Sequence, residues 1–160
     1  MQRRLSQAAI YRKVKHTLQK STYPIGRVEM SERCYCESGT VLIFTCSGAS
    51  NVGQIANQAA IRLTEEGTGK MYCLAGIGGH IPVMIEATRA ADRVVVIDGC
   101  DTACARKTIE HAGLLVTDWV CVTEEGISKN RDFKLNKKDI DLIARRTRES
   151  LARPAGAVKV

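Results

Sequence analysis

Three cysteines recur along the chain at a fixed interval. Cys46, Cys73 and Cys100 are separated by 27 residues and again by 27, which is about the length of one compact strand and helix unit. Each lies at or near the end of a short apolar run. In an open α/β sheet the functional crevice forms at the carboxyl ends of the strands. We therefore expect these three thiols to converge at that edge.

A fourth thiol follows in the stretch IDGCDTAC, residues 97 to 104, where a buried strand turns into a helix. With Asp101 as the N-cap, Cys100 and Cys104 take positions N′ and N3, whose side chains fold back over the helix start. The helix dipole and free N–H groups also favour thiolate over thiol there. The spacing thus predicts a local pair of thiols that completes a set of four.

Four thiolates in one place suit tetrahedral Zn²⁺ or an iron–sulfur cluster. Exposed thiols of low pKa would instead serve a redox or electron-transfer protein. Strand-end cysteines can also be small buried hydrophobes, and C-x₃-C differs from the C-x₂-C of zinc ribbons and thioredoxins. The residues alone leave these alternatives open, and they define no catalytic residue and no reaction.

The elements that must position these thiols alternate from residue 40 onward. Strand-like runs are TVLIFTC, GKMYCLAG, RVVVIDGC and TDWVCVTEEG, and helical stretches are NVGQIANQAAIRLTEEG, PVMIEATRAA and ARKTIEHAG. Short β-branched runs separated by helices call for parallel pairing and right-handed crossovers. We predict an α/β domain over residues 39–150, a Rossmann-like three-layer sandwich with a mostly parallel sheet of about four strands.

Helix boundary signals agree with this architecture. Ser50 and Asn51 can cap the first helix, Pro82 suits a first turn, and Gly67 and Gly113 sit where C′ glycines belong. DFKLNKKDIDLIARRTRESLA predicts a closing helix with Ile140, Ile143 and Leu151 facing inward. Its ARRTR run is most simply a solvated face that complements the dipole of the last turn, with a specific anion site as the alternative. Residues 151–160 form a tail.

Composition predicts one soluble domain. The chain has 160 residues, 44% of them hydrophobic and 4% aromatic, and no apolar run approaches the roughly 18 residues of a membrane span. It has seven cysteines but no secretory h-region. We therefore expect reduced thiols and a cytoplasmic protein.

The net charge of +7 is concentrated at the N-terminus, where residues 1–29 hold seven Lys or Arg and one Glu. The rest is nearly neutral, so we expect no nucleic-acid partner. We predict that residues 1–38 form a short basic amphipathic helix, capable of weak surface contacts, followed by a linker with the C-x-C pair Cys34 and Cys36. Met30 is an alternative start. No spacing rule assigns Cys34 and Cys36 a role.

Two phosphate-binding patterns are excluded, and several single residues are assigned. CSGASNVG has Val52 where a C-x₅-R phosphatase loop needs Arg. AGIGGH is followed by Ile81, where a dinucleotide fingerprint that begins at Gly76 needs Gly. The AGIGGH glycines are expected to let the backbone approach the thiols, with His80 as a polar loop residue or a ligand. We expect a structural role for Asp98 and a helix-end role for His111, and we assign Cys121 and Trp119 to the core.

The segments IDGCDTACARKTIEHAG, CSGASNVGQIANQAA and GKMYCLAGIGGH resemble the DGC-domain family, over roughly residues 40–150. The family's name matches Asp98, Gly99 and Cys100. Its members are described as zinc-binding through four cysteines, and the resemblance assigns those roles to Cys46, Cys73, Cys100 and Cys104. It therefore implies a zinc ion as cofactor and partner, and it implies no particular reaction.

Overall fold

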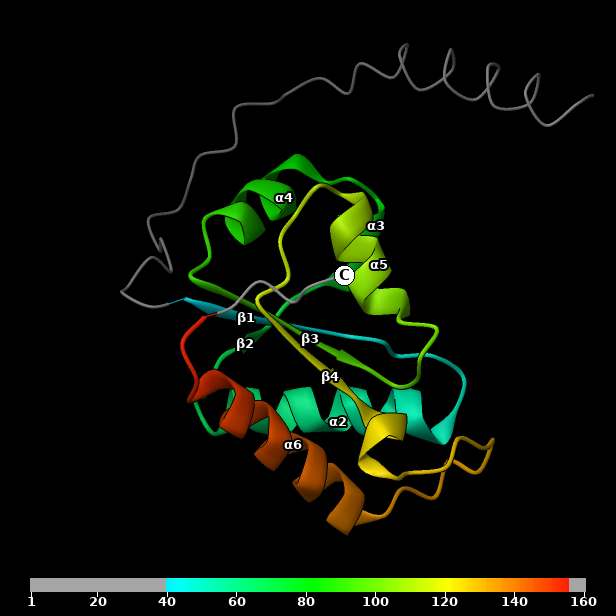
Figure 1. Cartoon of the computed structure of the whole chain (residues 1–160). Helices are drawn as coiled ribbons and strands as arrows, with labels where there is room; N and C mark the ends of the chain where they lie inside the picture. The colour runs from blue at the N-terminus through cyan, green and yellow to red at the C-terminus, as the bar shows by residue number, and fades with distance from the viewer. Residues whose placement is uncertain (1–39, 156–160) are drawn as a thin grey trace, which may run out of the picture. The chain divides into compact units, whose positions relative to one another are not determined.

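The computed structural model describes residues 40–155, in which a four-stranded parallel sheet lies between two layers of helices (Figure 1). The strand order is β2-β1-β3-β4, with every neighbouring pair parallel. The strands are β1 (Val41–Thr45), β2 (Lys70–Met71), β3 (Arg93–Asp98) and β4 (Asp118–Cys121). This confirms the predicted α/β class and its Rossmann-like layers.

Helices cover both faces of the sheet and create two apolar cores. Figure 1 shows α2 (Asn51–Glu65) and α6 (Lys137–Leu151) on one side, with α3 (Leu74–Gly78), α4 (Pro82–Arg89) and α5 (Cys104–His111) on the other. Successive strand residues point to opposite faces, so Ile43 packs on the α2 and α6 side and Phe44 on the α5 side. Both are fully buried, which stabilises the fold by about 1.5–3 kcal/mol per side chain.

Most predicted helix ends are confirmed. Ser50 caps α2, since its side chain accepts a hydrogen bond from the Gly53 N–H, and Pro82 is the first residue of α4. Gly67 and Gly113 adopt φ values of 74° and 71° just after helices, which favour glycine. On α6, Ile143 is fully buried, with Ile140 and Leu151 partly buried against the same core, as expected.

The structure corrects the predicted strand GKMYCLAG. Only Lys70 and Met71 pair with β1, at the exposed edge of the sheet, because the chain then turns into α3. Cys73 is the N-cap of that helix, which the sequence did not predict. After β4 the chain forms a short 3₁₀ turn, η1 (Val122–Glu125).

The predicted N-terminal helix, the pair Cys34 and Cys36, and the last five residues lie outside the described residues 40–155. Within that range, none of the helices combines the length and apolar character that crossing a bilayer requires.

Candidate thiol site

The four cysteines of the predicted site lie at strand ends and helix starts. Cys46 directly follows β1, Cys100 lies two residues beyond β3, Cys73 precedes α3, and Cys104 is the first residue of α5. All four are free thiols. Cys46 and Cys100 are half-buried, whereas Cys73 and Cys104 are exposed to solvent.

Three of the thiols share one neighbourhood. Cys46 and Cys104 are close enough that a charge on one affects the other, and the Lys129 ammonium interacts with both Cys46 and Cys100. Parallel strand ends meet at the same edge of the sheet, which explains how residues so far apart in sequence converge.

Cys73 is placed less directly. Helices α3 and α5 pack together. Their C-terminal ends lie side by side, since a Cβ on Gly78 would be 3.6 Å from Thr108 Cγ2 and the rings of His80 and His111 are 5.8 Å apart. The two helices run in the same direction for this reason. Cys73 and Cys104 therefore stand at the starts of two neighbouring helices.

The donor chemistry of this edge fits a soft metal ion, since thiolate sulfur is the preferred ligand of Zn²⁺ and of iron–sulfur clusters. The present side-chain arrangement is not a ready-made ligand set. Within residues 40–155, no three Cys, His, Asp or Glu side chains are grouped so that they could hold one ion. The four-cysteine metal site stays a prediction, and metal binding would require the thiols to move together.

Cys100 has the surroundings of an activated thiol. The Thr102 hydroxyl lies 3.5 Å from Cys100 Sγ, and the Lys129 Nζ donates to the same sulfur at 3.2 Å. Hydrogen bonds from Thr102 and Lys129 lower the pKa of the Cys100 thiol, although partial burial opposes the change. A cation beside a partly accessible thiol favours the nucleophilic thiolate.

Lys129 is held over Cys100 by Asn51, the first residue of α2. The Asn51 side chain donates to the Ser128 carbonyl at 2.9 Å and accepts from the Asn130 N–H at 2.7 Å. The Asn51 N–H also donates to the Asn130 carbonyl. Asn51 was predicted as a cap, but its side chain instead anchors the residues on either side of Lys129. No local sequence signal identifies Lys129, which lies 29 residues from Cys100.

Cys46 has the opposite character to Cys100. Burial raises the pKa of the Cys46 thiol, and it outweighs hydrogen bonds from the backbone N–H groups of Gly48 and Gly99 that lower it. Negative charge on Asp98 and Cys104 raises it further. The edge therefore combines one thiol whose pKa is raised with one whose pKa is lowered.

Asp98 organises the turn that carries the cysteine pair. Its carboxylate is fully buried and accepts hydrogen bonds from the Ala105 N–H at 2.8 Å, the Arg106 N–H at 3.0 Å and the Trp119 Nε1–H at 3.1 Å. These contacts confirm its structural role. A carboxylate at a helix N-terminus both satisfies free N–H groups and complements the helix dipole.

The predicted N-cap at Asp101 is wrong. Helix α5 begins at Cys104, after Ala103, which adopts the left-handed conformation with φ 51°. Cys104 is therefore the first helical residue and not the third. The physical reason is that the buried carboxylate of Asp98 already accepts from the first-turn N–H groups, so the exposed Asp101 is not needed as a cap.

Three glycines hold the loops of this edge in close backbone contact. A Cβ on Gly99 would lie 2.7 Å from the Gly53 nitrogen, and one on Gly53 would lie 2.8 Å from the Gly48 nitrogen. Side chains at Gly53 and Gly99 would push apart the segments that carry Cys46 and Cys100. The expectation that AGIGGH supplies the close approach is not met, because Gly76 instead makes room for Met84.

The other singled-out residues lie in ordinary surroundings. Cys121 is buried, with 2% of its surface exposed, as expected of a core residue. Trp119 is half-buried and packs on the same core as α5, with the Arg106 guanidinium 5.2 Å from its ring centre. His80 and His111 are exposed and face each other at the far ends of α3 and α5.

Fold and site together define a parallel α/β domain with thiols at its carboxyl edge. The chain belongs to the DGC domain family, whose model matches residues 42–147. It is similar to the Anaerobic and virulence modulator AnvM of Pseudomonas aeruginosa, with 33% identity over 88 residues, which cover 55% of this chain and 67% of that protein. No solved structure matches the chain.

The three residues that match the family's name have separate physical roles. Asp98 caps α5, Gly99 permits close contact with Gly53, and Cys100 presents its sulfur to Lys129. The motif thus fixes the start of α5, lets the Gly99 loop approach the start of α2, and places the Cys100 thiol beside Lys129.

Proposed function

We propose that the protein acts through thiol chemistry centred on Cys100. The observation that carries this proposal is the Lys129 ammonium 3.2 Å from Cys100 Sγ. A neighbouring cation stabilises thiolate, which is the nucleophile in thiol–disulfide exchange. Cys100 is half-buried and so keeps partial access to solvent.

The proposed reaction is exchange with a disulfide of another molecule. The Cys100 thiolate attacks one sulfur of that disulfide, forms a mixed disulfide and releases the other sulfur as thiolate. A second thiol of the same edge, Cys46 or Cys104, then loses its proton and attacks Cys100. The substrate leaves as a dithiol after gaining two electrons, and the protein retains an internal disulfide.

The name of the relative AnvM refers to anaerobic conditions. A thiol pair whose oxidation follows the redox state of its surroundings would suit a modulator of that kind. Such chemistry requires that the resting protein be kept reduced, so we propose the cytoplasm as its compartment.

Limited alkylation tests this function. Reduced protein is treated with a small amount of iodoacetamide at neutral pH, and the labelled cysteines are identified by mass spectrometry. We expect Cys100 to be labelled first, and oxidation by a small disulfide to join Cys100 to Cys46 or Cys104. Equal labelling of Cys100 and the exposed Cys73, or the absence of an internal disulfide after oxidation, would contradict the proposal.

A second candidate is zinc binding by Cys46, Cys73, Cys100 and Cys104. It is favoured by the mutual effect of Cys46 and Cys104 and by the position of Cys73 and Cys104 at neighbouring helix starts. Four thiolates would hold a closed tetrahedral site. Elemental analysis of protein purified anaerobically separates the two candidates, because a zinc site would hold about one ion per chain and thiol exchange needs none. An absorption spectrum distinguishes zinc, which is colourless, from an iron–sulfur cluster, which is brown.

A further inference from the structure

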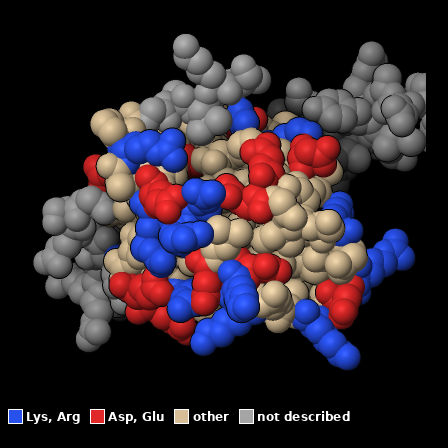
Figure 2. All heavy atoms as spheres, turned by 60° about the horizontal axis from the view of Figure 1, so that its bottom comes forward, with Lys and Arg blue, Asp and Glu red and all other residues tan. Residues whose placement is uncertain are grey.

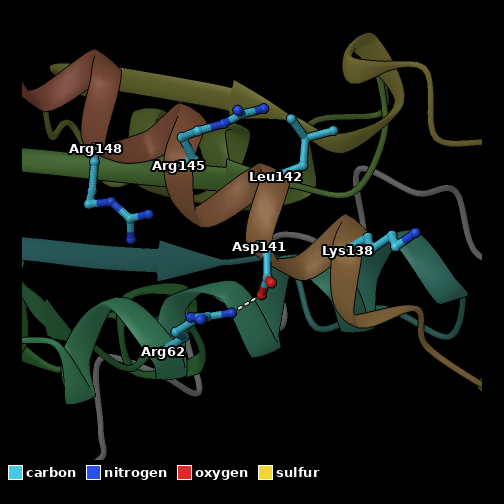
Figure 3. A pocket seen from close by; sticks show the side chains of 6 residues that line it. All are labelled: Arg62, Lys138, Asp141, Leu142, Arg145 and Arg148. Carbon is cyan, nitrogen blue, oxygen red and sulfur yellow. Dashed lines mark ion pairs between the residues drawn. The ribbon is translucent and has the colours of Figure 1, made fainter.

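A hollow away from the thiols lies beside α2 and α6, the helices on the opposite side of the sheet from α5. Its volume is about 470 Å³, within the range of roughly 300–1,000 Å³ that small-molecule sites occupy. Figure 3 shows the side chains that line it: Arg62, Lys138, Asp141, Leu142, Arg145 and Arg148.

The lining combines one flank of α6 with a cation from α2. Lys138, Asp141, Leu142, Arg145 and Arg148 follow helical spacing and so share a face of α6. Arg62 reaches them from α2 and pairs with Asp141 (Figure 3). Two arginines of the ARRTR run, which was predicted to be most simply a solvated face with a specific anion site as the alternative, border this hollow.

Two of the four cationic side chains that line the hollow, Arg62 and Arg148, are already paired with carboxylates. Arg62 and Arg148 both hydrogen bond to Glu66, at 3.0 and 2.6 Å, and Arg62 also pairs with Asp141. Two arginines and two carboxylates therefore form a closed network. This network holds the Arg62 and Arg148 side chains in place at the wall of the hollow.

The other two cationic side chains of the hollow, Lys138 and Arg145, are not neutralised by a close carboxylate in the described part of the chain. Lys138 has no ion pair within residues 40–155, and Arg145 Nε lies 3.9 Å from Glu149, a carboxylate that binds Arg146 more closely at 3.0 Å. Both side chains are exposed at the hollow. Guanidinium groups bind oxyanions through paired N–H donors, and an ammonium adds a point charge.

The surrounding surface argues for a small ligand. Figure 2 brings the underside of Figure 1 forward and shows acidic and basic side chains interspersed on it. A nucleic acid would require a continuous basic stripe. Lys138 and Arg145 add positive charge at the hollow itself, where Leu142 adds an apolar wall.

We propose that this hollow binds a small phosphorylated molecule, with Lys138 and Arg145 contacting its phosphate oxygens and Leu142 contacting its carbon skeleton. The site is independent of the thiol chemistry proposed above.

Calorimetric titration of the full chain with inorganic pyrophosphate tests the proposal. We expect saturable one-to-one binding that weakens by about tenfold in Arg145→Gln and in Lys138→Gln, because each loses a charge-assisted hydrogen bond. Lys107→Gln removes an exposed charge on α5 and is the matched control. Its affinity should equal that of the unmodified chain, and thermal melts of all variants should coincide.

Equal weakening in all three variants would show nonspecific attraction and overturn the proposal. So would the absence of binding up to about 10 mM pyrophosphate, or binding of an oligonucleotide that pyrophosphate fails to displace.

Discussion

The ammonium of Lys129 donates to the sulfur of Cys100 across 3.2 Å, although 29 residues separate the two in sequence. This contact depends on the segment from Ser128 to Asn130 being tied to Asn51 at the start of α2. The environment of the cysteine is therefore set by a residue at the start of another helix, through a loop with no regular structure.

Asn51→Ala should reduce both stability and thiol reactivity. The buried amide makes two side-chain hydrogen bonds to the loop, and their loss should lower the free energy of unfolding by about 1–3 kcal/mol. Alkylation of Cys100 at neutral pH should slow because Lys129 is released. Chemical denaturation and a rate assay measure the two effects.

The exposed Gln58 on the same helix gives the matched control. Gln58→Ala should change stability by less than about 0.5 kcal/mol and leave the rate unchanged. If Asn51→Ala slowed alkylation even when Lys129 was already replaced, the effect of Asn51 would not act through Lys129.

Asp98→Asn should destabilise the protein by about 2–4 kcal/mol. The carboxylate accepts three hydrogen bonds in a fully buried position, and an amide would replace one acceptor oxygen with a donor that faces N–H groups. Thermal unfolding measures the change. Asp101→Asn, at an exposed neighbouring carboxylate, should unfold like the unmodified chain, and equal losses in both variants would refute the capping role.

Gly99→Ala and Gly78→Ala should have opposite effects. A Cβ on Gly99 would meet the Gly53 backbone at 2.7 Å, so the loops must separate at a cost of about 1–3 kcal/mol. A Cβ on Gly78 would make only an ordinary contact with Thr108, and alanine in a helix can add up to about 1 kcal/mol. Denaturant titrations of both variants decide whether backbone contact at Gly99 is required.

Metal content tests the second candidate function, which is zinc binding. If the protein holds zinc through the four predicted cysteines, about one ion per chain should be found, and Cys100→Ser or Cys104→Ser should abolish it. Cys121→Ser is the control, because that buried thiol lies in the core. If elemental analysis found unchanged metal content in all three variants, the ligand assignment would be wrong.

The sequence was sufficient to predict the elements that local rules determine. Alternating apolar runs predicted the parallel sheet, and Ser50, Pro82 and Gly113 marked helix ends correctly, because capping and turn preferences act over a few residues. The short helix α3 was missed, since the glycines of AGIGGH favour a loop.

Contacts between distant segments could not be predicted in the same way. The position of Asp101 made it the natural cap, but Asp98 competes for the same N–H groups from the end of a buried strand. Lys129 carries no local signal, because its partner is fixed by tertiary contacts through Asn51. Residue type located the thiols, whereas their pKa values depend on these long-range neighbours.

The most direct test of the account is the alkylation rate of Cys100 as a function of pH, followed by mass spectrometry. The pKa of Cys100 is lowered from the ordinary thiol value of 9.0, so its rate should reach half-maximum below that pH, because thiolate forms earlier. Thr102→Val and Lys129→Gln should each move the midpoint upward, while Lys134→Gln, at an exposed lysine five residues after Lys129 in the sequence, should not. A midpoint at or above 9.0 in the unmodified protein, unaffected by either substitution, would contradict the claim that Cys100 is an activated thiol.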